Sequence, residues 1–371
     1  MARLFLGAAL ALVLVAPAGA QGRPPAFESP EVQDDETVVF RYFAPSASAV
    51  QLSGQFLDGN VEMTKGDDGV WSYTTAPIEP DMYPYNFVVD GVSVSDPRNG
   101  DLFPNEGFQA SIVEITGDEP LVHTVQDVPH GTVSYHYYTS PELGERPVVV
   151  YTPPGYEDDP DREYPILYLL HGTTDTEETW TKVGRANIIL DNLIAAGDAE
   201  PMIVAMPYGR AYPTISTQSG SLREWENLQA FKPDFMEHLM PFVESTYRVR
   251  QDPESRAIAG FSGGGGTSLY FGLNNTDLFS YVVGFAPGMR VEEIERNNAV
   301  AFEDPDLTNE RLNLFWMAVG EDDFTIRAIR EYVEVLDDRG IEHEMFVSGG
   351  GHTWMNCKLY LSMLAPRLFQ E

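Results

Sequence analysis

A serine in the middle of the chain stands in a pattern that could make it a nucleophile. Residues 260–266 read Gly-Phe-Ser-Gly-Gly-Gly-Gly and contain the motif Gly-x-Ser-x-Gly around Ser262. The short run 256–259 before the motif predicts a strand, and residues 267–271 after it predict the start of a helix. A side chain at either glycine of the motif would collide with the neighbouring strand or helix. This context favours a nucleophile at the apex of a sharp turn over a glycine-rich structural loop.

A nucleophilic serine needs a base, and two histidines follow Ser262 in the chain. His343 lies in residues 341–347, which alternate in the manner of a strand, and this favours a structural role. His352 follows three glycines, 349–351, just past the carboxyl end of that predicted strand. Catalytic groups of open α/β sheets lie at this edge, so we expect His352 to be the base.

The histidine needs an acid to orient it, and this acid should follow the preceding strand, predicted at residues 312–319. Three carboxylates compete there: Glu321, Asp322 and Asp323. They cannot all orient the histidine. The others would be solvated turn residues, or would cap the helix that begins near Thr325.

The charge that develops on an attacked carbonyl oxygen needs two backbone N–H donors. Gly263, the residue after the nucleophile, is expected to supply one of them. The other should come from the loop after the strand at 166–170, where we assign Thr173 and keep Gly172 as the alternative. His171 in the same loop is expected to pack near this oxyanion hole as a structural residue.

Other side chains could line a pocket for an aromatic acyl group. Tyr208, Arg210, Tyr212 and Trp225 lie in stretches without a strand or helix pattern. Tyr208, Arg210 and Trp225 are therefore candidate substrate-binding residues. The alternative is that they are ordinary loop residues, because aromatic side chains are common in loops.

These residues need a sheet whose strands end at a common edge. Residues 118–371 alternate apolar runs with helical stretches. The runs are 148–151, 166–170, 202–206, 257–259, 281–285, 312–319 and 344–347, and the helical stretches include 186–196, 235–247, 326–339 and 355–369. This alternation predicts an α/β fold with a mostly parallel sheet and helices on both faces. The chain order Ser, Asp or Glu, His is that of an α/β-hydrolase.

The first third of the chain has a different pattern. Residues 37–117 contain short runs rich in β-branched and aromatic residues, which predict a small all-β immunoglobulin-like sandwich. Residues 1–20 have a basic start, an apolar run too short for a bilayer and an Ala-x-Ala site. They predict a cleavable signal peptide rather than an anchor helix, followed by a polar leader at 21–36. The mature protein would then be secreted or periplasmic.

The composition excludes several kinds of partner. The net charge of −34 opposes binding to nucleic acid or to an anionic membrane. The single cysteine, Cys357, rules out an intramolecular disulfide and a cysteine-based metal site. The acidity fits either adaptation to high salt or the simple solubility of a secreted protein.

Segments along the second part of the chain resemble the esterase D and feruloyl esterase group, carbohydrate esterase family 1. They include Tyr-Thr-Pro-Pro-Gly-Tyr at 151–156, Tyr-Pro-Ile-Leu-Tyr-Leu-Leu-His-Gly at 164–172, Ala-Ile-Ala-Gly-Phe-Ser at 257–262 and Gly-Gly-Gly-His at 349–352. The resemblance runs from residue 140 to the C-terminus. It implies a serine esterase that needs no metal or cofactor and acts on ester-decorated plant polysaccharides. The family pattern places the acid three residues after a glycine, which favours Asp323, with Asp322 second.

The chain departs from this family at one position of the motif. The family usually has Ser-Met-Gly-Gly, whereas residues 262–265 read Ser-Gly-Gly-Gly. Glycine at position 263 keeps the N–H donor and removes a side chain from the floor of the pocket. The departure predicts a wider acyl pocket or a looser turn.

The predicted sandwich resembles the early-set modules of carbohydrate-binding module family 48. Phe-Arg-Tyr-Phe-Ala-Pro at 40–45 and Tyr-Pro-Tyr-Asn-Phe-Val-Val-Asp-Gly at 83–91 carry the resemblance. It implies a glycan-binding role, or else a module that only shapes the rim of the active site. Trp71 could stack on a sugar, but a lone tryptophan in a sandwich strand is more often a core residue.

Residues and resemblances together predict acyl-enzyme catalysis on an ester-decorated polysaccharide or oligosaccharide. Ser262 would attack the ester, His352 would take its proton and Asp323 would hold the imidazole. A feruloyl ester is favoured, with an acetyl ester of xylan second. The alternatives are a siderophore trilactone esterase or acyltransferase of the same fold, and a glycan-binding protein with an idle hydrolase domain.

Overall fold

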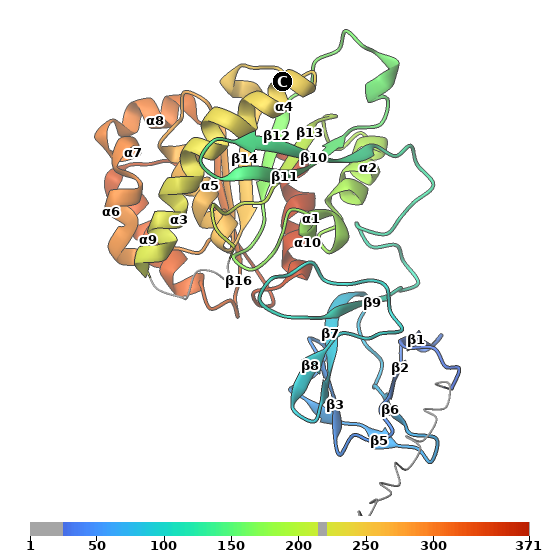
Figure 1. The fold of residues 1–371 in the computed structure, drawn as a ribbon. Helices are drawn as coiled ribbons and strands as arrows, with labels where there is room; N and C mark the ends of the chain where they lie inside the picture. Colours follow the sequence, from blue (N-terminus) through green and yellow to red (C-terminus); the bar gives the residue numbers. More distant parts are fainter. Residues whose placement is uncertain (1–24, 214–220, 371) are drawn as a thin grey trace, which may run out of the picture.

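A computed structural model describes residues 25–213 and 221–370, and of residues 221–225 it describes the backbone alone. The predicted signal peptide at 1–20 lies outside the described residues. Within the described ranges the chain forms an N-terminal β-sandwich and a larger α/β domain (Figure 1). The predicted fold class is confirmed. None of the helices in these ranges is long and apolar enough to span a bilayer.

The sandwich consists of two antiparallel sheets with one core between them. The sheets have the orders β1-β2-β6-β5 and β4-β3-β7-β8, and β9 also pairs with β7. The strands are β1 Glu31–Val32, β2 Val38–Phe43, β3 Val50–Gly54, β4 Val61–Glu62, β5 Thr64–Lys65, β6 Val70–Thr74, β7 Asp81–Val89, β8 Val92–Val94 and β9 Ser111–Ile115. Trp71 is buried in this core and its indole donates to the Ala44 carbonyl, so it offers no stacking surface to a sugar.

The sandwich begins earlier than the sequence pattern indicates. The sequence predicts a polar leader at residues 21–36, but β1 lies within them and pairs with β2. The Ser29 hydroxyl also donates to the buried Asp96 carboxylate at 2.6 Å. A strand of two residues has too few positions to show an alternating pattern, so the sequence gives no sign of it.

The α/β domain is built on one eight-stranded sheet with the order β10-β11-β13-β12-β14-β15-β16-β17. Its strands are β10 Thr132–Ser140, β11 Gly144–Thr152, β12 Ile166–Leu170, β13 Ile203–Pro207, β14 Arg256–Phe261, β15 Tyr281–Phe285, β16 Leu314–Gly320 and β17 Glu344–Ser348. The β10–β11 and β11–β13 pairs are antiparallel, and the five other pairs are parallel. Edge strand β10 was not predicted, because it is polar and half exposed and forms no apolar run.

Helices cover both faces of this sheet. They are α1 Thr179–Lys182, α2 Ala186–Ala196, α3 Ser221–Pro233, the π-helical η3 Asp234–Leu239, α4 Met240–Thr246, α5 Gly263–Leu273, α6 Ile294–Asn297, α7 Ala299–Glu303, α8 Pro305–Arg311, α9 Ile326–Arg339 and α10 Trp354–Leu364. Short 3₁₀ segments are η1 Tyr156–Asp158, η4 Pro253–Ser255, η5 Val291–Glu293 and η6 Ala365–Arg367. On one face, the Phe285 ring contacts Trp180 of α1 and Tyr360 of α10. On the other face, Tyr168 of β12 contacts Phe235 of η3.

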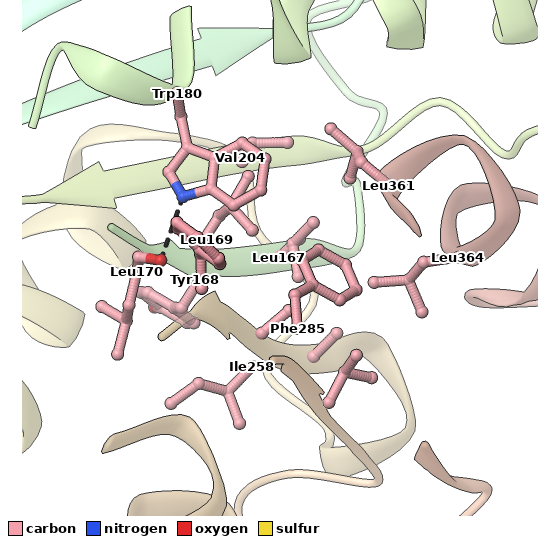
Figure 2. Packing of buried hydrophobic residues seen from close by; sticks show 14 of the residues in the cluster. Leu167, Tyr168, Leu169, Leu170, Trp180, Val204, Ile258, Phe285, Leu361 and Leu364 are labelled. Carbon is pink, nitrogen blue, oxygen red and sulfur yellow. Dashed lines mark hydrogen bonds between the residues drawn. The ribbon is translucent and has the colours of Figure 1, made fainter. Parts of the chain in front are cut away.

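The core around β12 fixes the start of the loop that was predicted to hold an oxyanion donor. Figure 2 shows Trp180 lying close to Leu169 and Val204 in this core. The Trp180 indole donates to the Leu170 carbonyl at 3.0 Å. Because Leu170 is the last residue of β12, this bond fixes the point where the chain leaves the sheet.

Polar contacts join the sandwich to the α/β domain on the side of α1 and α10 (Figure 1). The Lys358 ammonium on α10 is buried and pairs with the Asp81 carboxylate of β7. His123 lies 3.6 Å from the same carboxylate, and burial lowers the pKa of His123 to about 4. Buried charges are costly unless they are paired, so this cluster holds the two parts in a defined orientation.

Candidate active site

Ser262 occupies the sharp turn between β14 and α5. Its backbone has φ 53° and ψ −116°, a conformation that residues other than glycine rarely adopt. The Ser262 N–H donates to the Phe285 carbonyl at 2.9 Å. The Ser262 carbonyl accepts from the N–H groups of Gly266 (3.0 Å) and Gly288 (2.7 Å). Three backbone hydrogen bonds thus hold the turn.

Two glycines of the motif are required by close backbone contacts. A Cβ atom at Gly260 would lie 2.5 Å from the backbone of Gly264. A Cβ atom at Gly264 would lie 2.3 Å from the carbonyl oxygen of His171. Both distances are far shorter than van der Waals contact. The predicted collisions are therefore confirmed, and they explain why this turn needs glycine on both sides of the serine.

The acid beside His352 is Asp323. Its Oδ2 lies 2.8 Å from Nδ1 of His352, and its side chain is only 1% exposed. Asp322, the alternative, is exposed. The two partners follow the carboxyl ends of neighbouring parallel strands, β16 and β17, which brings them together across 29 residues of sequence.

Hydrogen bonds stabilise the charged form of the Asp323 carboxylate, although Asp323 is buried. Burial alone would raise its pKa, but the bonds from His352 and from the N–H and hydroxyl groups of Thr325 outweigh that effect. The two Thr325 bonds measure 2.8 Å and 2.7 Å and both end on Oδ1. The net result is a pKa of Asp323 below its usual value, as an acid that orients a histidine requires.

The His352 ring contacts two phenylalanines, one of which, Phe261, directly precedes Ser262. Its centroid is 4.6 Å from the ring of Phe261 and 4.4 Å from the ring of Phe324. Phe324 is 77% exposed, although it is a large apolar residue. Among the described residues no hydrogen bond joins Ser262 to His352. This contact is often long in hydrolases without substrate.

Gly263 and Thr173, the two predicted oxyanion donors, lie side by side. A Cβ atom at Gly263 would be 2.4 Å from the Thr173 hydroxyl and 3.4 Å from its Cα. The room that a larger residue would need at position 263 is therefore taken by the Thr173 side chain. The wider acyl pocket expected from the glycine at 263 stays a prediction, and the Thr173 hydroxyl fills the space nearest to that glycine.

His171 is held as a neutral structural residue. Its Nε2 accepts from the Gly209 N–H at 2.9 Å, so its proton lies on Nδ1, which is 2.7 Å from the Gly172 carbonyl. Burial lowers the pKa of His171 to about 4. The ring thus has no free nitrogen with which to act as a base, in agreement with the structural role expected from the sequence.

A cavity of about 400 Å³ opens beside Ser262. The predicted residues Gly172, Thr173, Gly263 and Arg210 contribute to its lining. Residues that the sequence did not single out contribute the rest, among them Asn227, Leu228, Leu269, Tyr270, Met289, Arg290, Glu293, Ile294, Phe324 and Tyr332. They carry no motif, since they come from helices and loops far apart in the sequence. Mixed apolar and polar walls of this kind are typical of small-molecule sites.

The other predicted substrate-binding residues lie differently. Tyr208 does not line the described cavity; its ring packs 5.5 Å from His171, and its hydroxyl donates to Glu106 at 2.8 Å. The backbone of Trp225 belongs to α3 rather than to a loop, and its side chain lies outside the described residues. Within the part of the chain that the structure describes, no group of three His, Cys, Asp or Glu side chains is placed to bind a metal ion.

Two family models match the chain. The model described as "Putative esterase" matches residues 140–355, and the model of carbohydrate-binding module 48 (isoamylase N-terminal domain) matches residues 28–100. An endo-1,4-beta-xylanase/feruloyl esterase of Xylanibacter ruminicola is 28% identical over 354 residues, which are 93% of this chain. The chain spans 46% of the length of that relative.

Solved structures of esterases share the fold. A carbohydrate esterase family 1 ferulic acid esterase of Anaeromyces mucronatus has a TM-score of 0.58 and is 25% identical, over 69% of this chain and 98% of its own. An enterobactin esterase of Shigella flexneri has a TM-score of 0.63 over 89% of this chain and 92% of its own. Its identity of 16% shows a common fold alone.

These matches confirm both resemblances that were predicted from sequence segments. The esterase match includes β14, which precedes Ser262, β16, which precedes Asp323, and also His352. Because that match covers more than half of the chain, the protein belongs to this esterase family.

Proposed function

We propose that this protein is a serine carboxylic-ester hydrolase in which Ser262, His352 and Asp323 act together. The observation that carries the proposal is the 2.8 Å hydrogen bond between His352 and Asp323. The His352 ring also contacts Phe261, the residue before the strained turn at Ser262. A serine hydroxyl is a weak nucleophile unless a base takes its proton and an acid orients that base. Membership of the esterase family supports the same reaction class.

In the proposed first half-reaction, Ser262 Oγ attacks the ester carbonyl carbon while Nε2 of His352 takes its proton. Asp323 accepts the Nδ1 hydrogen bond and stabilises the imidazolium. The N–H groups of Gly263 and Thr173 donate to the carbonyl oxygen as it becomes an anion. His352 then gives its proton to the leaving alcohol oxygen, the C–O bond breaks, and the acyl group remains on Ser262.

The second half-reaction repeats these roles with water. His352 takes a proton from a water molecule, which attacks the acyl carbon, and the same two N–H groups stabilise the second anion. When the bond to Ser262 Oγ breaks, His352 returns the proton to that oxygen. The products are a carboxylic acid and the free enzyme.

The proposed substrate is an ester-substituted plant polysaccharide or oligosaccharide, with a feruloyl group favoured and an acetyl group on xylan second. Support comes from the Xylanibacter ruminicola relative and from the ferulic acid esterase that shares the fold. The cavity of about 400 Å³ has apolar walls such as Leu228 and Met289, which suit a planar aromatic acid better than an acetyl group.

The proposed roles are tested by Ser262→Ala, which should abolish nearly all turnover of methyl ferulate and of 4-nitrophenyl acetate. Ser245→Ala is a matched control, because Ser245 is an exposed serine of α4, and it should behave as the wild type. If Ser262→Ala kept its activity, the assignment of the nucleophile would be wrong.

A siderophore trilactone is an alternative class of substrate, because enterobactin esterases share the fold over most of the chain. The net charge of −34 repels an anionic ferric siderophore. Arg210 and Arg290, however, bring two cations to the cavity. Turnover of methyl ferulate, acetylated xylan and a catecholate trilactone, compared at equal enzyme concentration, distinguishes the three substrates.

Glycan binding by the sandwich is a separate part of the proposal, supported by the match to carbohydrate-binding module 48. Retention of Ser262→Ala on insoluble xylan measures it without hydrolysis. Export is also proposed, from the signal peptide predicted at 1–20. If it is correct, N-terminal sequencing of the exported protein should begin at Gln21.

A further inference from the structure

The sandwich reaches the active site through one loop, which we call the docking loop and define as residues 104–108, between β8 and β9. Its backbone forms an isolated antiparallel bridge between Asn105 and Asp175. The Glu106 N–H donates to the Thr174 carbonyl at 2.7 Å. The Pro104 carbonyl accepts from the Thr179 hydroxyl at 2.8 Å. The docking loop therefore lies directly against the loop that carries Thr173.

Hydrogen bonds fix both the nitrogen and the oxygen of the Asn105 side-chain amide. Its Nδ2 donates to the Thr174 hydroxyl at 2.9 Å and to Asp175 Oδ1 at 2.8 Å. Its Oδ1 accepts from the N–H groups of Gly107 (2.7 Å) and Phe108 (3.2 Å). Four hydrogen bonds leave this amide one orientation, with its donors facing the α/β domain.

Asp175 connects the Asn105 side chain to Gly172, the residue before Thr173. Its Oδ1 receives the Asn105 bond, and its Oδ2 accepts from the Gly172 N–H at 3.1 Å. The carboxylate is 5% exposed, and burial raises its pKa to about 6. A buried carboxyl group with both oxygens bonded has little freedom to shift.

Thr173 is thus held from both sides. Gly172 on one side is bonded to Asp175, and Thr174 on the other side is bonded to the docking loop by its carbonyl and its hydroxyl. The Thr173 N–H belongs to the peptide between Gly172 and Thr173, so its direction depends on these contacts. An oxyanion donor is effective only if it already points to the developing charge, and a shift of 1 Å can cost about 100-fold in rate.

A second contact joins the docking loop to Tyr208, which follows β13. The Glu106 carboxylate accepts from the Tyr208 hydroxyl at 2.8 Å. Tyr208 precedes Gly209, whose N–H donates to the buried His171 ring. His171 and Gly172 are adjacent. The docking loop therefore stabilises the loop after β12, which contains Thr173, through contacts at two places.

We propose that Asn105 is a positioning residue for the oxyanion hole, and that the N-terminal sandwich is thereby a working part of the esterase site. The inference rests on the proposed function, and in particular on Thr173 as an oxyanion donor. It assigns the sandwich a role that does not depend on glycan binding. Hydrolysis should therefore depend on Asn105 even for an ester that has no sugar.

The test compares the full chain with Asn105→Ala and Thr174→Val on 4-nitrophenyl acetate. Both variants should lower kcat about tenfold or more and change KM by less than about threefold, because the lost bond positions Thr173, whose N–H stabilises the transition state more than the bound substrate. Both should also weaken binding of an aryl boronic acid, which forms a tetrahedral adduct on serine, by a similar factor. Thr174→Val tests the same contact from the α/β side if Asn105→Ala does not fold.

Asn99→Ala is the matched control. Asn99 also donates two bonds through Nδ2, to the Tyr85 hydroxyl and the Ile112 carbonyl, but both stay within the sandwich. It should change thermal stability without the loss of kcat. A normal kcat for Asn105→Ala and Thr174→Val, an effect on KM alone, or an equal loss in Asn99→Ala would each overturn the inference. Ser262→Ala, assayed beside them, reports separately whether the proposed function itself holds.

Discussion

His352 and Asp323 are joined by a 2.8 Å hydrogen bond between Nδ1 and Oδ2, while the other oxygen of Asp323 is held by Thr325. The carboxylate is therefore fully occupied and cannot rotate without breaking three bonds. Asp322, one residue earlier, faces solvent. Of two adjacent carboxylates, only one is in a position to orient the imidazole.

Asp323→Asn should lower kcat by roughly 10³ to 10⁴ with methyl ferulate. An asparagine amide can present a donor to Nδ1, which would favour the histidine tautomer that cannot take the serine proton. Asp322→Asn is the matched control and should stay close to the wild type. Steady-state kinetics of both variants check this, and an inactive Asp322→Asn enzyme with an active Asp323→Asn enzyme would contradict it.

Gly263→Ala should lower kcat about tenfold, because its Cβ would meet the Thr173 hydroxyl at 2.4 Å and push the two oxyanion donors apart. The double variant Gly263→Ala/Thr173→Ala should recover much of this loss, since the nearest remaining Thr173 atoms are 3.4 Å or more away. The measurement is kcat for 4-nitrophenyl acetate in a double-mutant cycle. Additive losses in the double variant would show that the two side chains do not compete for this space.

Phe324→Ala should lower kcat/KM more for a sugar ester of ferulate than for methyl ferulate. In the proposed reaction His352 gives its proton to the leaving alcohol, which would then lie beside the imidazole. The exposed Phe324 ring is the apolar surface next to that imidazole. Loss of that contact should cost about 1–2 kcal/mol for the sugar ester, or about tenfold. Phe324→Tyr keeps the ring and should retain the preference. Equal losses of kcat/KM for both substrates would mean that the Phe324 ring acts only through its contact with His352.

Asp175 should make the stability of the protein depend on pH between about 4 and 6. Burial raises the pKa of Asp175 from the usual 3.8 to about 6, so the folded state binds more protons than the unfolded state in this range. The free energy of unfolding should therefore fall by up to about 3 kcal/mol as the pH rises from about 4 to about 6.

Asp175→Asn should remove this slope, although it also loses one hydrogen-bond acceptor and should be less stable at low pH. Urea unfolding of both proteins at several pH values between 4 and 7 checks the prediction. All other titrating groups are common to both chains, so the difference between the two curves reports Asp175. Parallel curves would contradict the raised pKa.

Several elements of the α/β domain could be predicted because buried parallel strands are apolar on both faces. The runs at 166–170 and 281–285 match β12 and β15, and the helices at 186–196 and 326–339 match α2 and α9. The helix predicted at 235–247 is divided into η3 and α4, and its first part is π-helical. Edge strands β1 and β10 carry weaker patterns, since an edge strand is partly exposed.

The sequence alone determined which residue types could do the chemistry and in which order they follow the strands. Gly-x-Ser-x-Gly fixes Ser262 at a turn, and the glycines before His352 mark a loop at the same edge of the sheet. These signals are local, because they reflect backbone conformations that only certain residues allow. They left open whether Asp322 or Asp323 is the acid, and what the glycine at 263 does.

The tertiary structure decided which carboxylate reaches His352 and what lies beside Gly263. Asp323 is buried and hydrogen-bonded to His352, and the Thr173 side chain lies beside Gly263. The contact of Asn105 with Asp175 joins residues 70 positions apart in different domains. Such a contact depends on how two folded surfaces meet, and no local pattern in the chain records that.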